Sequence, residues 1–323
     1  MILSSTVQSV SPTIPLVLQP QDMKLHSWCE DHLPINPSVK VVTTDQSVAG
    51  RGVFAMEDLQ QDERICFIPN ALVFHQENCA SCFPQLAQEI SKSKQKYGFG
   101  MDKKKFAWIH RLWRKVARKT RVQPEFYHLE EDDLWQPELT LYALEAIKEN
   151  HPWKEWIDQW NRDDPTYSLF KKNAKVYDEE VIDLTAKELQ KQANYLSDLH
   201  LKAALSIRLG RFEEQKQVLP LKDDVETSSM YSLLGSRAGE LGDNLTGVIP
   251  FHDMINHSLD PNLSMSYGPD HIEIYANRPI EKGQELFLCY TEIGREMSTT
   301  NALWSLLQWG IPHRKEDIKI FDF

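Results

Sequence analysis

Hydrophobic and polar residues alternate from residue 39 to residue 74, with short polar turns between the runs, which is the pattern of β-strands. A short helix is predicted before this stretch, over residues 23–32, because Pro34 ends the helical pattern there. The alternation predicts strands over residues 41–44, 50–54 and 64–68. The first part of the chain is therefore predicted to be rich in β-structure.

The hydrophobic period becomes helical in the middle of the chain. Apolar residues fall on one face over residues 106–120 and again over residues 138–150. Three tryptophans continue that face beyond Pro152, which is expected to break the helix. The longest helix is predicted from Asp178 to Gly210, because acidic residues suit its first turn and glycine suits its end.

A second β-rich stretch begins at Val248, with a hairpin and a last hydrophobic strand over residues 285–290. A helix capped by the Ser-Thr-Thr run at 298–300 is expected to end at Trp309, and residues 318–321 can form one more strand. Neither β-rich stretch has enough strands to bury both faces of a sheet. We therefore expect the two stretches to pair with each other and the helices to form an inserted lobe.

The composition is that of an ordinary globular protein, with 41% hydrophobic residues among 323, enough for one substantial core or two modest ones. No apolar run is long enough to cross a bilayer, so no membrane partner is expected. The first 20 residues carry no charge and lack the features of a secretory signal. They are interpreted as a loose tail, and a role in organelle targeting stays open.

The five cysteines form an odd and uneven set, which favours a reduced intracellular compartment, either cytoplasm or nucleus. Cys79 and Cys82 make a single CxxC pair, whereas zinc needs about four ligands. They are interpreted as ordinary thiols in a turn. His252, Asp253 and His257 do not have the spacing of a helical metal motif, and we predict no metal site.

The formal net charge is −11, but the segment from Lys103 to Arg121 carries nine lysines or arginines and no acidic residue. Such a segment can contact nucleic acid or an acidic protein. The favoured interpretation is an amphipathic helix whose cations pair with acidic neighbours such as residues 130–133. Retention on immobilised nucleic acid would separate these alternatives.

Three short motifs carry candidate chemistry, although each has a simple structural interpretation when taken alone. Gly50-Arg51-Gly52 allows close approach of the backbone to a ligand, or a tight turn. Asn256-His257-Ser258 has side chains that bond nearby backbone, as in a capped turn. Tyr290 ends a strand, where tyrosine commonly places its ring in the core.

The order of these motifs is more informative. Gly-Arg-Gly follows a first strand, Ser236-Arg237-Ala238 comes after the helical region, and then come Val-Ile-Pro-Phe-His-Asp-Met-Ile-Asn-His-Ser and Gly-Gln-Glu-Leu-Phe-Leu-Cys-Tyr. This order resembles the SET methyltransferases related to the Rubisco large-subunit lysine methyltransferase. The resemblance covers residues 25–323 and is most specific in the last 90 residues.

The resemblance implies an α+β fold, the SET fold, made of small β-sheets around a pseudoknot and interrupted by a helical insert known as iSET. A threaded segment of this kind is rare in proteins. Four parts are predicted on this basis: a flexible tail over 1–24, an N-terminal SET part with the basic helix over 25–135, the iSET insert over 136–234, and a C-terminal SET part over 235–323.

The resemblance also implies S-adenosylmethionine as the methyl donor. By motif, the backbone of Gly50, Arg51 and Gly52 would line this cofactor, and the Arg237 guanidinium would pair with its carboxylate. The cofactor amine and adenine would be held by Asn256 and His257. The same loop would be supported by Asp253. The active-site tyrosine of the family corresponds to Tyr290.

Methyl transfer to an amine needs alignment more than acid–base power, so positioning can supply much of the catalysis. The amine must arrive neutral, although the pKa of free lysine is near ~10.4. An apolar aromatic channel disfavours the ammonium form, and the Tyr290 phenol can hydrogen-bond the amine. The resemblance thus implies an enzyme that methylates a lysine of a non-histone protein.

Two departures from the family pattern affect the expected substrate. Ten residues separate Tyr290 from Asn301, and Trp309-Gly310-Ile311 stands where the family often has Tyr-Gly-Phe. The positions of Trp309 and Ile311 border the amine channel in the family, together with Tyr290. A protein-histidine methyltransferase of the same fold, or a SET-like module that binds partners without turnover, therefore stays an alternative.

The sequence stops near the point where relatives begin a helical substrate-binding domain. Docking of a protein substrate is then expected to use the SET core, the insert or another protein. We expect the chain to be a monomer.

Overall fold

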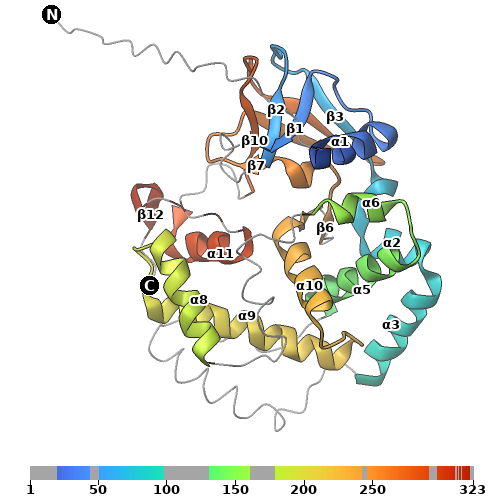
Figure 1. Ribbon diagram of the computed structural model, residues 1–323, viewed down its shortest axis with the longest axis vertical. Coiled ribbons are helices and arrows are strands. Elements are labelled where there is room, and N and C mark those ends of the chain that lie inside the picture. The colour runs from blue at the N-terminus through green and yellow to red at the C-terminus, as the bar shows by residue number, and fades with distance from the viewer. Residues whose placement is uncertain are drawn as a thin grey trace, which may run out of the picture. The chain divides into compact units, whose positions relative to one another are not determined.

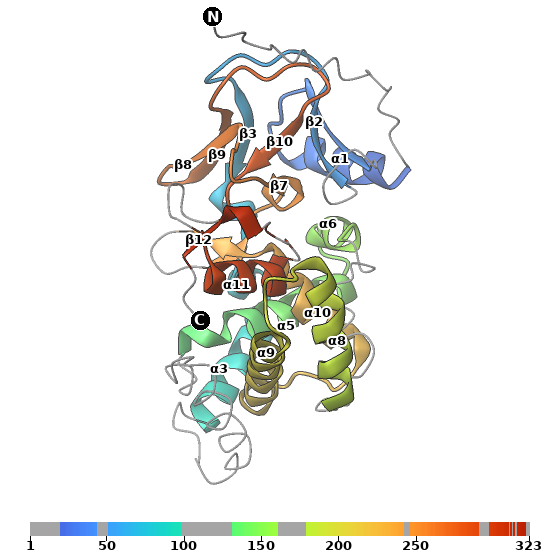
Figure 2. The same ribbon diagram turned by 90° about the vertical axis from the view of Figure 1, so that its left-hand side faces the viewer.

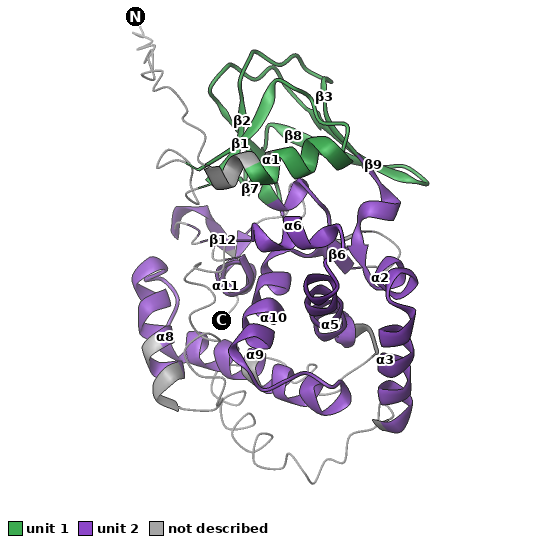
Figure 3. Ribbon diagram, turned by 45° about the vertical axis from the view of Figure 1, so that its right-hand side comes forward, with its two compact units in different colours: residues 1–67, 254–289 green, residues 68–253, 290–323 purple. Residues whose placement is uncertain are grey.

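The computed structural model describes residues 20–43, 51–97, 131–160, 179–241, 246–290, 297–309, 311, 313 and 315–320. The chain divides into two compact units (Figure 3). Unit 1 contains residues 1–67 and 254–289, and unit 2 contains residues 68–253 and 290–323. Gly50 and the basic segment 103–121 lie outside the described residues.

Unit 1 is built from two small sheets and one helix. The first sheet has the strand order β1-β2-β10-β7. Its strands are β1 (Val39–Thr43), β2 (Arg51–Ala55), β10 (Glu285–Leu288) and β7 (Asn256–His257). Strand β2 is antiparallel to both β1 and β10, whereas β10 is parallel to β7.

The second sheet places β3, β9 and β8 side by side (Figure 2). Its strands are β3 (Arg64–Pro69), β9 (His271–Ala276) and β8 (Leu263–Tyr267). Buried and half-buried residues alternate along β9, because successive side chains of a strand point to opposite faces. The helix α1 (Pro20–His32) packs against β1 and buries Leu25, Trp28 and Cys29.

The predicted pairing of the two β-rich stretches is confirmed within unit 1. Strand β2 comes from the first stretch and β10 from the second, with Phe54 opposite Glu285 and Val53 opposite Leu286. The hairpin predicted after residue 258 is formed by β8 and β9.

Unit 2 is mainly helical (Figure 1). Its longer helices are α2 (Gln76–Cys82), α3 (Pro84–Tyr97), α5 (Trp135–Lys148), α6 (Trp153–Asp158), α8 (Glu179–Gln192), α9 (Asp198–Val218), α10 (Val225–Arg237) and α11 (Thr299–Trp309). A small sheet has the order β4-β6-β5, and β11 pairs in parallel with β12. These strands are β4 (Phe74–His75), β5 (Gly239–Glu240), β6 (Thr246–Val248), β11 (Met297–Ser298) and β12 (Ile318–Ile320).

Four short 3₁₀ turns complete the described elements, namely η1 (Asn70–Leu72), η3 (Glu131–Leu134), η5 (His252–Met254) and η6 (Lys315–Asp317). In the chain, η1 lies between β3 and β4, η3 leads into α5, and η5 precedes β7. Residue Phe251 before η5 has a φ of 68°, a backbone conformation that is costly for a bulky side chain.

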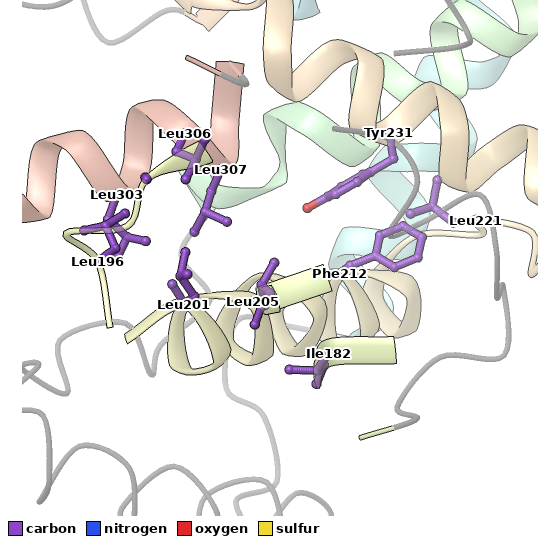
Figure 4. Close-up of a cluster of buried hydrophobic side chains, with 13 residues drawn as sticks. Ile182, Leu196, Leu201, Leu205, Phe212, Leu221, Tyr231, Leu303, Leu306 and Leu307 are labelled. Carbon is purple, nitrogen blue, oxygen red and sulfur yellow. The ribbon is translucent and has the colours of Figure 1, made fainter. Parts of the chain in front are cut away.

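A hydrophobic cluster joins α8, α9, α10 and α11 (Figure 4). Helix α9 contributes Leu201, Leu205 and Phe212, and α11 contributes Leu303, Leu306 and Leu307. The residues within each helix recur at spacings of three, four or seven, which places them on one face. Burial of each such side chain contributes about 1.5–3 kcal/mol. The Tyr231 hydroxyl is satisfied inside this unit by donating to Gln215 Oε1 at 2.7 Å.

Several predicted helix ends are confirmed. Pro152 separates α5 from α6, and the tryptophans beyond it are buried. The Ser298 hydroxyl accepts a hydrogen bond from the Asn301 N–H at 3.1 Å, which caps α11 as predicted. The tail also forms the predicted strand, β12.

The single helix predicted from Asp178 to Gly210 is wrong. Helix α8 ends at Gln192, and a new helix, α9, begins after Ser197, whose hydroxyl accepts a hydrogen bond from the His200 N–H at 3.2 Å. Gly210 does not end α9, which continues to Val218. Tertiary packing of the following residues outweighs the helix-ending preference of glycine here.

Cys79 and Cys82 lie on α2, so the prediction that they occupy a turn is wrong. Burial raises the pKa of the Cys79 thiol well above its usual value, which keeps it protonated. Among the described residues, no helix is both long and apolar enough to cross a membrane.

Candidate functional site

In unit 1, two predicted cofactor-binding positions meet at the β2–β10–β7 side of the first sheet. The Asn256 side-chain nitrogen donates to the Arg51 carbonyl at 2.7 Å and to Glu285 Oε1 at 2.6 Å. These two bonds use both protons of the amide group. The oxygen Oδ1 is therefore the atom through which Asn256 can accept a hydrogen bond from a ligand.

Gly52, on β2, lies close to this contact. A Cβ atom at this position would overlap Glu285 Oε1 and would come within 3.0 Å of Asn256 Nδ2. The close neighbour of Gly52 is thus a side chain of the same unit. A residue with any side chain at position 52 would force the Glu285 carboxylate to move.

Asn262 fixes the strand that carries Glu285. Its side chain donates to the Glu285 carbonyl at 2.9 Å and accepts from the Phe287 N–H at 2.7 Å. His257 is half-buried on β7 and is paired in register with Leu288. The backbone around Glu285 is thereby held on both sides, which fixes the position from which its carboxylate reaches Asn256.

In unit 2, Arg237 and Asp253 form a buried pair. The Arg237 side chain is 10% exposed and that of Asp253 is fully buried. Arg237 Nη1 donates to the Asp253 carbonyl at 3.1 Å and lies 3.5 Å from its Oδ2 atom. A buried carboxylate of this kind needs its cation, because an unpaired buried charge is strongly destabilising.

Two tryptophans contact this pair of residues. Trp156 Nε1 donates to Asp253 Oδ1 at 3.4 Å, and the Arg237 guanidinium lies over the Trp160 ring, 5.6 Å from its centroid. The two indoles pack edge to face with centroids 5.0 Å apart. Arg237 Nε is buried and has no hydrogen-bond acceptor among the described residues. This N–H can therefore donate to an anionic ligand.

Tyr290, also in unit 2, lies in an aromatic cluster. Its ring is 5.6 Å from that of Trp309, at an interplanar angle of 69°, and 6.2 Å from the His252 ring. His252 Nδ1 is buried and has no hydrogen-bond partner in the described part of the chain. Burial lowers the pKa of His252 to about 4, so its imidazole is neutral at pH 7.

Ile311, the third predicted channel residue, is half-buried just after α11. Its N–H donates to the Ser305 carbonyl at 3.3 Å, which holds the chain close to the end of the helix. Tyr290 and Trp309 thus pack together as a pair, and Ile311 follows on the same segment of unit 2.

The predicted site residues therefore fall into three groups, each within one unit: Arg51 and Gly52 with Asn256, Arg237 with Asp253, and Tyr290 with Trp309. Their functional roles stay predictions. No cluster of three or more His, Cys, Asp or Glu side chains suited to a metal ion occurs among the described residues.

Four further residues contact the predicted site residues, and the sequence did not predict these contacts. They are Glu285 beside Asn256, His252 beside Tyr290, and Trp156 and Trp160 beside the pair of Arg237 and Asp253. Glu285 belongs to a strand pattern, and the tryptophans belong to a helical apolar face. Their contacts join distant parts of the chain, so no local spacing identifies them.

Small mixed sheets interrupted by a long helical segment, with an Asn-His strand and a late tyrosine, define a SET-type protein. The family model described as "SET domain" matches residues 50–291, which is more than half of the chain. The chain therefore belongs to the SET-domain family. The predicted α+β SET fold is confirmed, whereas the pseudoknot threading stays a prediction.

Two curated relatives match short segments. "Histone-lysine N-methyltransferase SMYD3" of Mus musculus is 33% identical over 63 residues, which is 20% of this chain and 14% of that protein. "Protein-lysine N-methyltransferase SMYD4" of Gallus gallus is 40% identical over 47 residues, which is 15% of this chain and 6% of that protein. The chain is thus similar to small parts of these proteins.

Solved structures are similar over most of the chain. "Crystal structure of the SET domain of LSMT bound to Lysine and AdoHcy" is 16% identical, with a TM-score of 0.53, and covers 93% of this chain and 58% of that chain. "Structure of Rubisco LSMT bound to Sinefungin and Monomethyllysine" is 15% identical, with a TM-score of 0.52 and the same coverage. At these identities the likeness shows the fold.

Proposed function

We propose that this chain is an S-adenosylmethionine-dependent methyltransferase that acts on a lysine side chain of a protein. The observation that carries the proposal is the uncharged aromatic cluster of Tyr290, Trp309 and His252 in a member of the SET-domain family. Further support comes from the relatives, which are named as lysine methyltransferases, and from the lysine and AdoHcy named in one similar structure.

Each unit, taken by itself, contains a group whose chemistry suits one end of the amino-acid part of this cofactor. Arg237 Nε is a buried donor without a partner among the described residues, which suits the cofactor carboxylate. Asn256 Oδ1 can accept from an ammonium group, because the amide nitrogen is engaged by Arg51 and Glu285. When bound, S-adenosylmethionine supplies a methyl group on a positively charged sulfur.

The aromatic cluster suits a neutral amine. An ammonium ion loses hydration when it enters such surroundings, which disfavours its charged form. His252 adds no positive charge there because its imidazole is neutral at pH 7. The Tyr290 hydroxyl can hydrogen-bond the amine, and Trp309 restricts the orientation of the phenol ring. Alignment of the amine is the contribution that this chain would make to catalysis.

The test is transfer of a labelled methyl group from S-adenosylmethionine into a cell lysate, followed by mass-spectrometric identification of the modified residue. We expect label on lysine with the wild type, and about a hundredfold slower labelling with a Tyr290→Phe variant. Label on histidine would support the histidine-specific alternative. Binding of S-adenosylmethionine in calorimetry without any labelled product would instead indicate a binding module and contradict the proposal.

A further inference from the structure

We infer that Glu285 is a positioning residue that fixes the orientation of the Asn256 amide and thereby makes this site selective for an ammonium group. The inference rests on the proposed function, because the ammonium is that of the cofactor's amino-acid part. The carrying observation is the pair of hydrogen bonds from Asn256 Nδ2, to Glu285 Oε1 at 2.6 Å and to the Arg51 carbonyl at 2.7 Å.

The two acceptors determine which end of the amide points toward them. If the Asn256 amide were flipped, its oxygen would face a carboxylate and a carbonyl, and two hydrogen bonds would be replaced by repulsion between acceptors. The orientation with Nδ2 toward Glu285 is therefore strongly preferred. The opposite end of the amide, Oδ1, can then only accept a hydrogen bond, which suits an ammonium and disfavours a carboxylate.

Only one of the two acceptors depends on a side chain. The Arg51 carbonyl is backbone and is present whatever residue occupies position 51. The other acceptor, the Glu285 carboxylate, belongs to a side chain and can be changed by substitution. Glu285 lies on β10, which pairs with β7, and its carbonyl accepts a hydrogen bond from Asn262. Its negative charge also favours a cationic ligand group over an anionic one.

Gly52 provides the space for this carboxylate. An added Cβ would overlap Glu285 Oε1, so that even an alanine would displace the carboxylate from its contact with Asn256. The glycine at position 52 thus leaves room for the contact between Glu285 and Asn256.

The test compares two ligands by calorimetry on the full chain. Sinefungin carries the ammonium and carboxylate of the cofactor's amino-acid part, whereas 5′-methylthioadenosine lacks that part. Glu285→Met removes the acceptor while keeping the length of the side chain. We expect the affinity for sinefungin to fall about tenfold or more, as for loss of a charge-assisted hydrogen bond, and that for 5′-methylthioadenosine to change by less than about twofold.

Two matched variants sharpen the result. Glu285→Gln keeps an oxygen acceptor and is expected to restore sinefungin affinity to within about threefold of the wild type. Glu273→Met removes a partly exposed carboxylate that pairs with Arg64 on the same unit, and it should leave both affinities unchanged. If Glu285→Met does not fold, Glu285→Leu replaces it, with the same selective loss expected.

Equal loss of both ligands, or no loss of sinefungin, would overturn the positioning role of Glu285. Wild-type protein that binds neither ligand would overturn the proposed function itself, and the inference with it. The two failures are distinguishable because the first requires a wild type that binds sinefungin.

Discussion

The ring of Tyr290 meets the ring of Trp309 edge to face, with centroids 5.6 Å apart. Edge-to-face packing of aromatic rings contributes about 0.5–1.5 kcal/mol beyond burial and restricts rotation of both rings. Since Trp309 is the last residue of α11, the orientation of the phenol depends on how that helix packs. The position of the Tyr290 hydroxyl therefore depends on the hydrophobic cluster that holds α11 against α9.

Removing only this hydroxyl tests its role. Tyr290→Phe keeps the ring and its contact with Trp309, so we expect unchanged affinity for sinefungin and a fall in methyl transfer of about a hundredfold, because the amine loses its alignment. The measurements are labelled methyl transfer and calorimetry. Tyr267→Phe, on the exposed end of β8, is the control and should keep the wild-type rate. Unchanged turnover in Tyr290→Phe would remove Tyr290 from the acceptor end of the site.

Replacing Arg237 should affect both folding and binding. Arg237→Met removes the cation that pairs with the fully buried Asp253 carboxylate, so we expect a loss of about 3–5 kcal/mol of unfolding free energy in urea. Arg237→Lys keeps a positive charge, so it should lose less stability but still bind sinefungin more weakly, because lysine lacks the planar fork.

The control for this pair is Arg278→Met. Arg278 also pairs with an aspartate, Asp260, but both side chains are largely exposed, and exposed ion pairs contribute about 0–1 kcal/mol. A loss of stability as large as that of Arg237→Met would mean that burial is not the cause of the difference.

His252 should make the protein less stable in acid. Burial lowers its pKa from 6.5 to about 4, so the unfolded chain binds the proton more readily between these values. Stability contributed by this group is present above pH 6.5 and is lost as the pH falls toward 4. In urea unfolding at pH 7 and pH 5, His252→Gln should lose less stability on acidification than the wild type, by about 1–2 kcal/mol.

Other buried histidines, such as His75 and His313, also have lowered pKa values and contribute to the acid sensitivity of the wild type. The difference between variant and wild type isolates His252. The exposed His32 provides the control, since His32→Gln should follow the wild-type pH dependence. Parallel curves for His252→Gln and the wild type would show that the imidazole is not held neutral.

Glu214 on α9 should make the protein less stable as the pH rises, whereas His252 makes it less stable as the pH falls. Burial raises the pKa of its carboxyl from 4.5 to about 7, with Arg211 opposing and Asp133 reinforcing the shift. The unfolded chain therefore loses this proton at lower pH than the folded chain, so stability falls as the pH rises from about 4.5 to about 7 and stays low above 7. Glu214→Gln should stabilise the protein by about 2 kcal/mol at pH 8 and by much less at pH 5. The exposed Glu89→Gln is the control, and an equal gain at both pH values would contradict the assignment.

The elements with a marked local pattern were predictable from the sequence. Alternation revealed the hairpin of β8 and β9, and Pro152 correctly separated α5 from α6. The Ser298 cap identified the start of α11. In each case the residues that determine the element are close together in the chain.

Helix α10 shows where local patterns fail. It is buried along most of its length, including Ser228, Ser229 and Ser232, so it has no polar face and no amphipathic period. Its beginning is nevertheless marked by Asp224, whose carboxylate accepts from the Thr227 N–H at 2.7 Å. Attention to caps would have located both this helix and the start of α9 at Ser197.

The site was predictable only in part. The motif order named Asn256 and Arg51, but the contact that joins them spans 205 residues of sequence, and the third member, Glu285, has no local signal. Likewise, Trp160 lies beside Arg237 although the two residues are far apart in the sequence. Such contacts depend on tertiary packing, which one sequence without its fold does not specify.

The pairing of β2 with β10 has a consequence for biosynthesis. Residue Phe54 leaves the ribosome long before its partner Glu285, and at about 5–20 residues per second the delay is roughly 10–50 s. During this time β1 and β2 form an incomplete sheet with an unpaired edge, which is a site for aggregation. The nascent N-terminal strands therefore keep this exposed edge until translation reaches the last strand.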